Sequence, residues 1–116
     1  MRHRNNNKIL DREKGTRELM LRNLASSILI YEKVKTTKAK AQAVRPLVER
    51  MISASKAGDL NARRGLIKVL LQKNAIKKAM EILGKRYYDR PGGYTRMVKI
   101  GVRKGDGAEM VQIELV

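Results

Sequence analysis

The spacing of apolar residues changes once along this chain, and the change divides it into two parts. From Leu21 to about Gly84, apolar residues recur every three or four positions, which is the period of an amphipathic helix. Beyond Gly84 they alternate with polar residues, which is the period of a strand with one buried face. Helices in one part and strands in the other predict an α+β domain.

Several amphipathic helices are expected in the first part. Thr16, Thr37 and Asp59 are the expected N-caps of three of them, because their side-chain oxygens can accept a free N–H of the first turn. Gly58 and Gly84 are expected to end two of the helices. The residues expected to be buried are Leu21, Leu24, Ala25 and Ile28, then Val44, Leu47, Val48, Met51 and Ile52, then Leu66, Ile67, Leu70 and Leu71, and finally Ile76, Ala79, Met80 and Leu83.

Two alternating segments at the end of the chain predict an antiparallel hairpin. They run from about Tyr94 to Ile100 and from about Met110 to Leu115, and a Gly-Asp-Gly turn lies between them. We expect Val98 to face the core together with Ile100, and the turn to carry cations. The β-branched residues in YEKVKTT further predict a short strand or an extended entry into the next helix. The expected fold is several amphipathic helices packed on a small, mostly antiparallel C-terminal sheet.

The first residues of the chain are rich in cations and poor in apolar side chains. We therefore expect residues 1–15 to form a basic N-terminal arm and residues 16–116 to form a single globular domain. Such an arm suits threading between phosphates, and the alternative is a solvated, disordered tail. The candidate RNA-binding residues of the arm are Arg2, His3, Arg4, Asn5, Lys8, Arg12 and Lys14.

Charge is the unusual feature of the composition. The chain has 27 Lys and Arg residues against 11 Asp and Glu residues, a formal charge of +16 that favours a polyanionic partner. Beyond the arm, Arg17 and Arg22 lie outside the apolar face of the first predicted helix. Arg103 and Lys104 lie at the predicted hairpin turn. No helix concentrates the side chains of a DNA recognition helix. Multipoint contact with the phosphates of a folded RNA fits this distribution.

The chain lacks the residues that most catalytic and metal sites require. His3 is the only histidine and there is no cysteine, so we expect no enzyme activity, no metal, no cofactor and no small-molecule substrate. The absence of cysteine suits a reducing cytosol. No run approaches the roughly 18 apolar residues of a membrane-spanning helix, and the first residues lack the apolar region of a signal peptide. We expect no membrane partner.

Five segments, in order, carry a family resemblance. They are MRHR at the start, LRNLASSI from Leu21, VKTTKAKA from Val34, RPGGYTR from Arg90 and GVRKGDGAEMVQIELV from Gly101. Together they resemble the bacterial large-subunit ribosomal protein seventeen family. The resemblance implies a structural constituent of the 50S subunit that binds 23S ribosomal RNA near the opening of the peptide exit tunnel. It also implies neighbouring large-subunit proteins as partners and a cytoplasmic or organellar ribosome as the location.

The resemblance also implies residues that bind RNA. In the family, the arm and the loops around RPGGYTR reach into RNA, and helix N–H groups in the TT…KAK region can meet phosphate. Added to the cations named above, the candidate residues are Asn23, Lys33, Lys35, Thr36, Thr37, Lys40, Arg90, Arg96 and Lys99.

Two other classes of protein share the charge of this chain. One is a free RNA-binding accessory factor or nucleoid protein, which would bind duplexes or many RNAs with similar affinity. The other is a membrane-surface protein, which is disfavoured because the apolar faces of the helices would be buried in a folded core and could not bind a membrane. Co-sedimentation with ribosomal particles in high salt separates an integral ribosomal component from a loosely bound factor.

Overall fold

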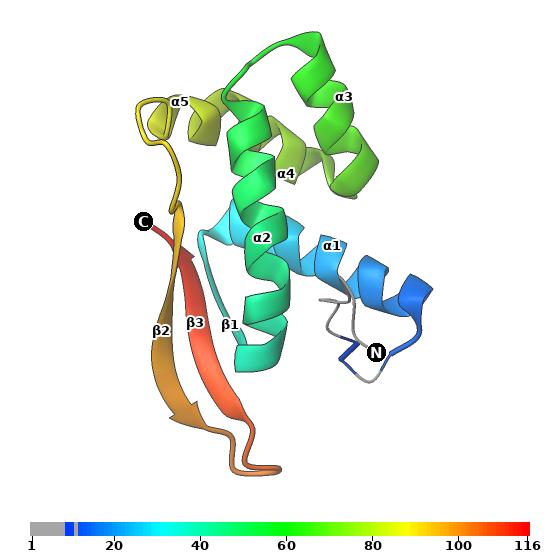
Figure 1. Ribbon diagram of the computed structural model, residues 1–116, viewed down its shortest axis with the longest axis vertical. Coiled ribbons are helices and arrows are strands. Elements are labelled where there is room, and N and C mark those ends of the chain that lie inside the picture. The colour runs from blue at the N-terminus through cyan, green and yellow to red at the C-terminus, as the bar shows by residue number, and fades with distance from the viewer. Residues whose placement is uncertain (1–8, 11) are drawn as a thin grey trace, which may run out of the picture.

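The computed structural model describes residues 9–10 and 12–116. In chain order the elements are α1 (Lys14–Tyr31), β1 (Lys33–Thr37), α2 (Lys38–Ser55), α3 (Leu60–Val69), α4 (Lys73–Lys78), a π-helical turn (Ala79–Leu83), α5 (Gly84–Arg86), β2 (Thr95–Val102) and β3 (Glu109–Leu115). The helix α2 runs along one face of the sheet, and α3, α4 and α5 gather at one end of the molecule (Figure 1). The β2–β3 hairpin reaches beyond the helices at the other end. This arrangement confirms the predicted α+β class.

The sheet has three antiparallel strands in the order β1-β3-β2, so the last strand is central. The short strand predicted in YEKVKTT forms and pairs with β3. On β3, Val111 and Ile113 are buried beneath α2. Because successive side chains of a strand point to opposite faces, this register fixes which residues of β2 face the core.

The predicted burial of Val98 and Ile100 is wrong, since these side chains are 44% and 49% exposed. Val98 pairs with Gln112 of β3, one position away from the buried Ile113, and therefore lies on the opposite face. Ile100 lies where the register shifts between Lys99 and Gly101. This half of β2 extends past the helices, so no core covers it (Figure 1).

The apolar faces of the helices supply most of the core, as the sequence predicts. Ala25 and Ile28 of α1, Val44 and Ile52 of α2, and Leu83 of the π-helical turn are fully buried. The predicted burial is wrong at two positions near α3, because Ile67 and Leu71 are 54% and 48% exposed. The helix α3 lies at the rim of the molecule and packs inward through Leu66 and Leu70. No described element covers its other flank.

Two of the three predicted N-caps are confirmed. The side chain of Thr37 accepts a hydrogen bond from the backbone N–H of Lys40 at 3.4 Å, and the side chain of Asp59 accepts one from Ala62 at 2.8 Å. The prediction for Thr16 is wrong, because α1 begins at Lys14. Its N-terminal flank, at Glu13, has no side-chain capping bond, so cap chemistry does not set this boundary.

The prediction that Gly84 ends a helix is also wrong. The chain continues through Gly84 from the π-helical turn into α5. A Cβ atom on Gly84 would lie 2.6 Å from the backbone oxygen of Ser55, at the end of α2. The glycine is therefore required for close approach between two helices rather than for termination.

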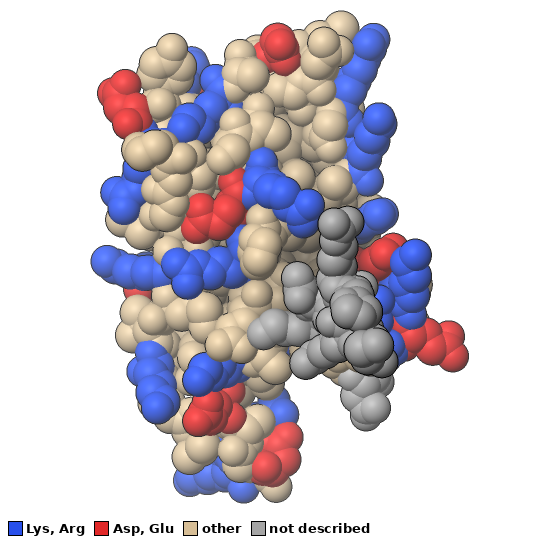
Figure 2. Space-filling view, viewed as in Figure 1, with Lys and Arg blue, Asp and Glu red and all other residues tan. Residues whose placement is uncertain are grey.

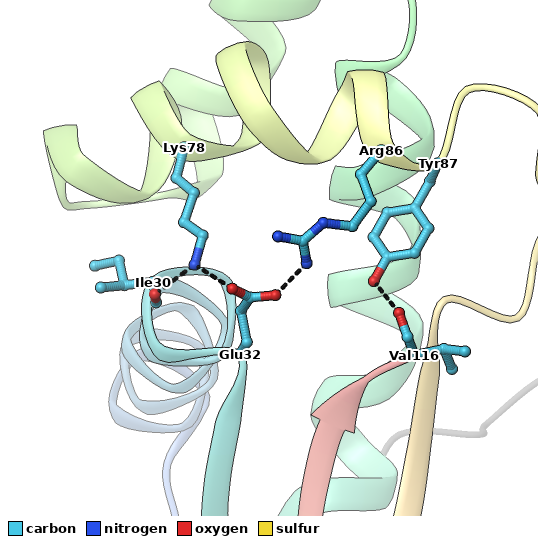
Figure 3. A network of polar contacts seen from close by, with 6 residues as sticks. All are labelled: Ile30, Glu32, Lys78, Arg86, Tyr87 and Val116. Carbon is cyan, nitrogen blue, oxygen red and sulfur yellow. Dashed lines mark hydrogen bonds and ion pairs between the residues drawn. The ribbon is translucent and has the colours of Figure 1, made fainter.

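A polar network joins the end of α1 to α4 and α5 (Figure 3). Glu32 ends α1 in the left-handed conformation, with φ 65°. Its carboxylate accepts hydrogen bonds from Arg86 and from Lys78, the latter at 3.0 Å. Donation by Arg86 and Lys78 lowers the pKa of Glu32 to about 2. The Tyr87 hydroxyl donates to the backbone oxygen of Val116 at 2.7 Å, so this end of the helical layer is tied to the C-terminus.

Candidate RNA-binding surface

The sheet face opposite α2, which we call the outer face, carries several of the predicted cations. In β1, Lys33 and Lys35 alternate with Val34, and Val34 pairs with the buried Ile113. The two lysines therefore lie on the outer face, where both are exposed. Figure 2 shows Lys and Arg side chains along the sheet side of the molecule, with acidic side chains between them. The strand alternation thus brings together cations that the sequence spaces two apart.

Arg96 is held on this face by a buried acid. It pairs with Glu114 of β3, and the Arg96 Nε atom lies 3.2 Å from the Glu114 Oε1 atom. The Glu114 side chain is 8% exposed, whereas the Arg96 side chain is 62% exposed. On the other side of β3, Lys33 of β1 lies opposite Glu114 in the strand register. One carboxylate thus fixes the position of Arg96 and leaves most of its side chain open to a ligand.

The N-terminus of α2 lies at the end of β1. Thr37 lies on the outer face and also caps this helix through Lys40, so its hydroxyl is already engaged. Lys38 pairs with Glu109 of β3 at 3.5 Å, and both side chains are about half exposed. The backbone N–H groups of the first helical turn point toward this corner of the sheet. They add partial positive charge to that of the lysines.

Two of the predicted residues fall on the other face. Thr36 and Lys99 both pair with Val111, whose buried side chain faces the helices. Thr36 is half-buried and Lys99 is exposed where the hairpin extends past α2. The structure therefore separates these two residues from Lys35 and Arg96, although they are close in sequence.

The segment from Tyr87 to Tyr94, which we call the 87–94 loop, is held by Glu49 of α2. The Glu49 carboxylate accepts hydrogen bonds from the backbone N–H groups of Tyr94 and Thr95, both at 3.1 Å. It also accepts the Thr95 hydroxyl at 2.8 Å. Gly93 has φ 65°, in the left-handed region that favours glycine. The loop enters β2 from a fixed point on the neighbouring helix.

A second set of contacts orders the loop around Arg90. The Lys56 ammonium donates to the backbone oxygen of Arg90 at 2.6 Å and to the Tyr94 hydroxyl oxygen at 2.9 Å. The Tyr94 hydroxyl donates in turn to the same backbone oxygen at 3.1 Å. Donation by Lys56, and then by Ser53, lowers the pKa of Tyr94. The exposed guanidinium of Arg90 donates to Gly92 O at 3.2 Å, so Arg90 projects from an ordered backbone.

The segment from Arg103 to Ala108, which we call the hairpin tip, is ordered by its own residues. The Arg103 guanidinium donates to both carboxylate oxygens of Asp106, at 3.0 and 2.6 Å. Arg103, with the backbone N–H of Ala108, lowers the pKa of Asp106 to about 2. Arg103 is therefore already paired, whereas Lys104 is exposed at the turn. The tip lies at the far end of the molecule from α3 (Figure 1).

The remaining candidates lie on or before α1. Lys14 and Asn23 are exposed, and Arg17 and Arg22 are half-buried. Arg12 donates to the backbone oxygen of Leu10 at 2.9 Å. The first half of α1 points away from the sheet, so these residues do not join the outer face (Figure 1). The other arm candidates, Arg2, His3, Arg4, Asn5 and Lys8, lie outside the described residues.

Sequence reasoning missed two residues that position the cations. Glu49 and Lys56 hold the 87–94 loop. Glu49 is the only acid in α2, whose other charged residues are all basic. This was the one feature of the sequence that could have pointed to its role. Nothing in the local sequence of Lys56 distinguishes it from the other lysines of the chain.

Within residues 9–10 and 12–116, no group of three or more His, Cys, Asp or Glu side chains could hold a metal ion. No helix in this part is both long and apolar enough to cross a membrane.

Comparison with known proteins identifies relatives along the whole chain. The family described as Ribosomal protein L17 matches residues 20–116. The large ribosomal subunit protein bL17 of Syntrophotalea carbinolica is 47% identical over 116 residues, which is 100% of this chain and 75% of that protein. The protein of the same name from Desulfitobacterium hafniense is 49% identical over 107 residues, covering 92% of this chain and 96% of that protein. The chain therefore belongs to the ribosomal protein L17 family, a family of ribosomal proteins rather than enzymes.

Proposed function

We propose that this protein is a structural constituent of the large ribosomal subunit and that it binds 23S ribosomal RNA through fixed cations on its sheet side. The outer face, the 87–94 loop and the hairpin tip provide these cations. The observation that carries the proposal is Arg96, which a buried carboxylate holds in place while 62% of its side chain stays exposed. Relatives that match 100% and 92% of the chain are named as large ribosomal subunit proteins.

Fixed cations suit a folded RNA for an energetic reason. Binding costs free energy whenever loops and long side chains must be ordered, and part of that ordering is already present here. Glu49 and Lys56 order the backbone beneath Arg90, and Glu114 orders Arg96. A guanidinium in a fixed position can donate two parallel hydrogen bonds to one phosphate. Lys33 and Lys35 add point charges at the other edge of the sheet.

The arm and the subunit position complete the proposal. Residues 1–15 act as a basic arm beside a single domain of residues 16–116, and the part of the arm before α1, which begins at Lys14, threads between RNA segments. The N-terminus of α2, with Lys38 and Lys40, meets a further phosphate. The family resemblance supports a position near the opening of the peptide exit tunnel, with neighbouring large-subunit proteins as further partners. The ribosome concerned is cytoplasmic.

Salt dependence tests the phosphate contacts directly. If six to ten phosphates are neutralised, affinity for a 23S ribosomal RNA fragment falls by roughly 10³ to 10⁵ between about 50 and 200 mM salt, by analogy with duplex DNA. Filter binding or fluorescence anisotropy over this range gives the slope. A nearly flat dependence would reject binding through phosphates.

Sedimentation in high salt tests integration into the subunit. We expect the tagged protein to remain with large subunits in a sucrose gradient at a salt concentration that strips loosely bound factors. Release of the protein under these conditions, together with equal affinity for unrelated RNA duplexes, would favour a free RNA-binding factor instead.

A further inference from the structure

The exposed leucine and isoleucine near α3 form part of a groove. The space between α3 and α4, which we call the α3–α4 groove, has a volume of about 680 Å³. Ile67, Leu71 and Ile76 contribute apolar surface to it. Ile67 and Leu71 are each about half exposed, so this surface is open to solvent in the isolated chain. Solvated apolar area of this kind is a source of binding free energy.

The rim of the groove is positively charged. Arg63 lies on the α3 side, and Lys73 and Lys77 lie on the α4 side. None of the residues that line the groove is acidic. Figure 2 shows a row of basic side chains along the edge of the molecule that α3 forms. The groove therefore combines an aliphatic floor with cations on both sides.

These two features select one kind of occupant. RNA would satisfy the cations, but bases bind by stacking on aromatic or guanidinium planes, and Arg63 at the rim is the only such side chain among the lining residues, so the aliphatic floor would be left without a partner. A second copy of this chain would bring the same cations against one another, at a net charge of +16 per copy. A helix with aliphatic residues on one face and acidic residues beside them satisfies both the floor and the rim.

We propose that the α3–α4 groove binds an acidic amphipathic helix of another protein. Leucine-type side chains of that helix cover Ile67 and Leu71, and its Asp and Glu residues pair with Arg63, Lys73 and Lys77. The helices α3 and α4, whose residues line the groove, lie at the opposite end of the molecule from the hairpin tip, so both surfaces can be occupied at once (Figure 1). This proposal does not depend on the RNA-binding function of the sheet side.

A synthetic helix serves as the probe for the isolated full-length chain. The peptide is about 18 residues long, with Leu at positions i, i+3, i+4 and i+7 and Glu on the flanks. One control peptide has Lys in place of Glu, and another has Ser in place of Leu. We expect fluorescence anisotropy to show at least tenfold tighter binding of the Leu–Glu peptide than of either control. Equal binding of the serine control would mean that charge alone attracts the peptide and would overturn the proposal.

Matched variants locate the binding site on the protein. Leu71→Ser is expected to weaken binding of the Leu–Glu peptide about tenfold. Leu19→Ser changes a leucine of similar exposure on α1, 51% against 48%, and should leave binding unchanged. If melting curves show that Leu71→Ser does not fold, Ile67→Ser replaces it. Equal effects of the groove and control variants would overturn the assignment.

A crosslink from the groove distinguishes protein from RNA in the assembled particle. The chain has no cysteine, so Ile67→Cys provides a unique attachment point for a photoreactive maleimide. In ribosomes isolated from cells that express this variant, we expect a crosslinked peptide that contains both acidic and aliphatic residues. Crosslinks only to RNA, or to no protein, would overturn the proposal. Failure of the variant and the unaltered chain alike to enter ribosomes would instead contradict the proposed function, and the peptide result would stand.

Discussion

The 87–94 loop and the hairpin tip both present cations, but different parts of the molecule hold them in place. The loop is held from outside, because Glu49 and Lys56 of the neighbouring helical segment bind its backbone. The tip is held from within, because Arg103 pairs with Asp106 three residues further along the chain. The loop is therefore coupled to the core through α2, whereas the tip can be changed with little effect on the rest of the fold.

This difference has a consequence for the cations themselves. At the tip, Arg103 forms the ordering contact, so its guanidinium is already shared with an acid. In the loop, the contacts from Lys56 and Tyr94 use the backbone of Arg90, and its exposed guanidinium donates to the uncharged backbone oxygen of Gly92 rather than to an acid. Ordering through the backbone leaves the charge more fully available to a phosphate. The comparison predicts unequal responses to mutation at the two places.

The largest expected difference concerns the acids that order each region. Glu49→Ala leaves the backbone N–H groups of Tyr94 and Thr95 and the buried Thr95 hydroxyl without this partner. We expect a loss of about 3 kcal/mol in the free energy of unfolding, and a Tm lower by about 10 °C. Thermal melts followed by circular dichroism measure this change.

Matched acid-to-alanine variants sharpen the same comparison. Asp106→Ala should lower the Tm by far less, because its partner Arg103 is exposed and water replaces the lost contact. Glu81→Ala removes an exposed acid from the π-helical turn and serves as the control. Equal losses for Glu49→Ala and Asp106→Ala would break the distinction between the two regions.

A smaller effect is expected from the glycines of the loop. Gly93 has φ 65°, a conformation that a β-branched residue adopts only with strain, whereas Gly92 has no such requirement. A Cβ atom meets no other atom within 4 Å at either position. Gly93→Val should therefore cost about 1 to 2 kcal/mol of stability through backbone strain alone. Urea titration of Gly93→Val and Gly92→Val gives both values, and the second should be within about 0.5 kcal/mol of the unaltered protein.

The smallest effect concerns the acid stability of the ion pairs that Glu32 forms at the end of α1. The pKa of Glu32 is lowered to about 2 by Arg86 and Lys78, so its contribution to stability is complete above the unfolded pKa of about 4.5. That contribution is lost as the pH falls toward 2, because the unfolded chain then binds the proton more readily. Its size is below about 1 kcal/mol, since the side chain is 34% exposed and solvent screens the pair.

The variant Glu32→Gln isolates this contribution. The stability difference between the unaltered protein and Glu32→Gln should be constant above pH 4.5 and should shrink between pH 4.5 and 2. Chemical denaturation at several pH values measures it. Asp106→Asn provides the comparison, because Asp106 is a more exposed acid whose pKa is also lowered to about 2. A difference that grows on acidification would contradict the assigned ion pair.

The two regions also show which features a sequence can reveal. The hairpin tip, and the caps at Thr37 and Asp59, depend on residues two or three positions apart, and local patterns predicted them. The contact between Glu49 and Tyr94 spans 45 positions, and no local pattern encodes it. The attachment of the loop to α2 was therefore not predictable from the local sequence.

Burial was predictable where the apolar face of a helix packs against another element, and unpredictable where it does not. The stripe of α2 lies against the sheet, so Val44 and Ile52 are buried as expected. At α3 the same period continues to Ile67, but no described element covers it. Alternation in β2 was recognised correctly, yet its inward face depended on pairing with β3, and Val98 was assigned to the wrong side.

The central claim is that RNA binds fixed cations on the sheet side, and not positive charge in general. Two double variants that each remove one lysine and one arginine test it. Lys35→Ala with Arg90→Ala changes the outer face and the 87–94 loop, and Arg64→Ala with Lys68→Ala changes exposed cations of α3. Affinity for a 23S ribosomal RNA fragment is measured at one salt concentration, and melting curves verify folding. We predict a loss of about 10- to 30-fold for the sheet-side pair and less than about threefold for the α3 pair. Equal losses for the two pairs would contradict the account.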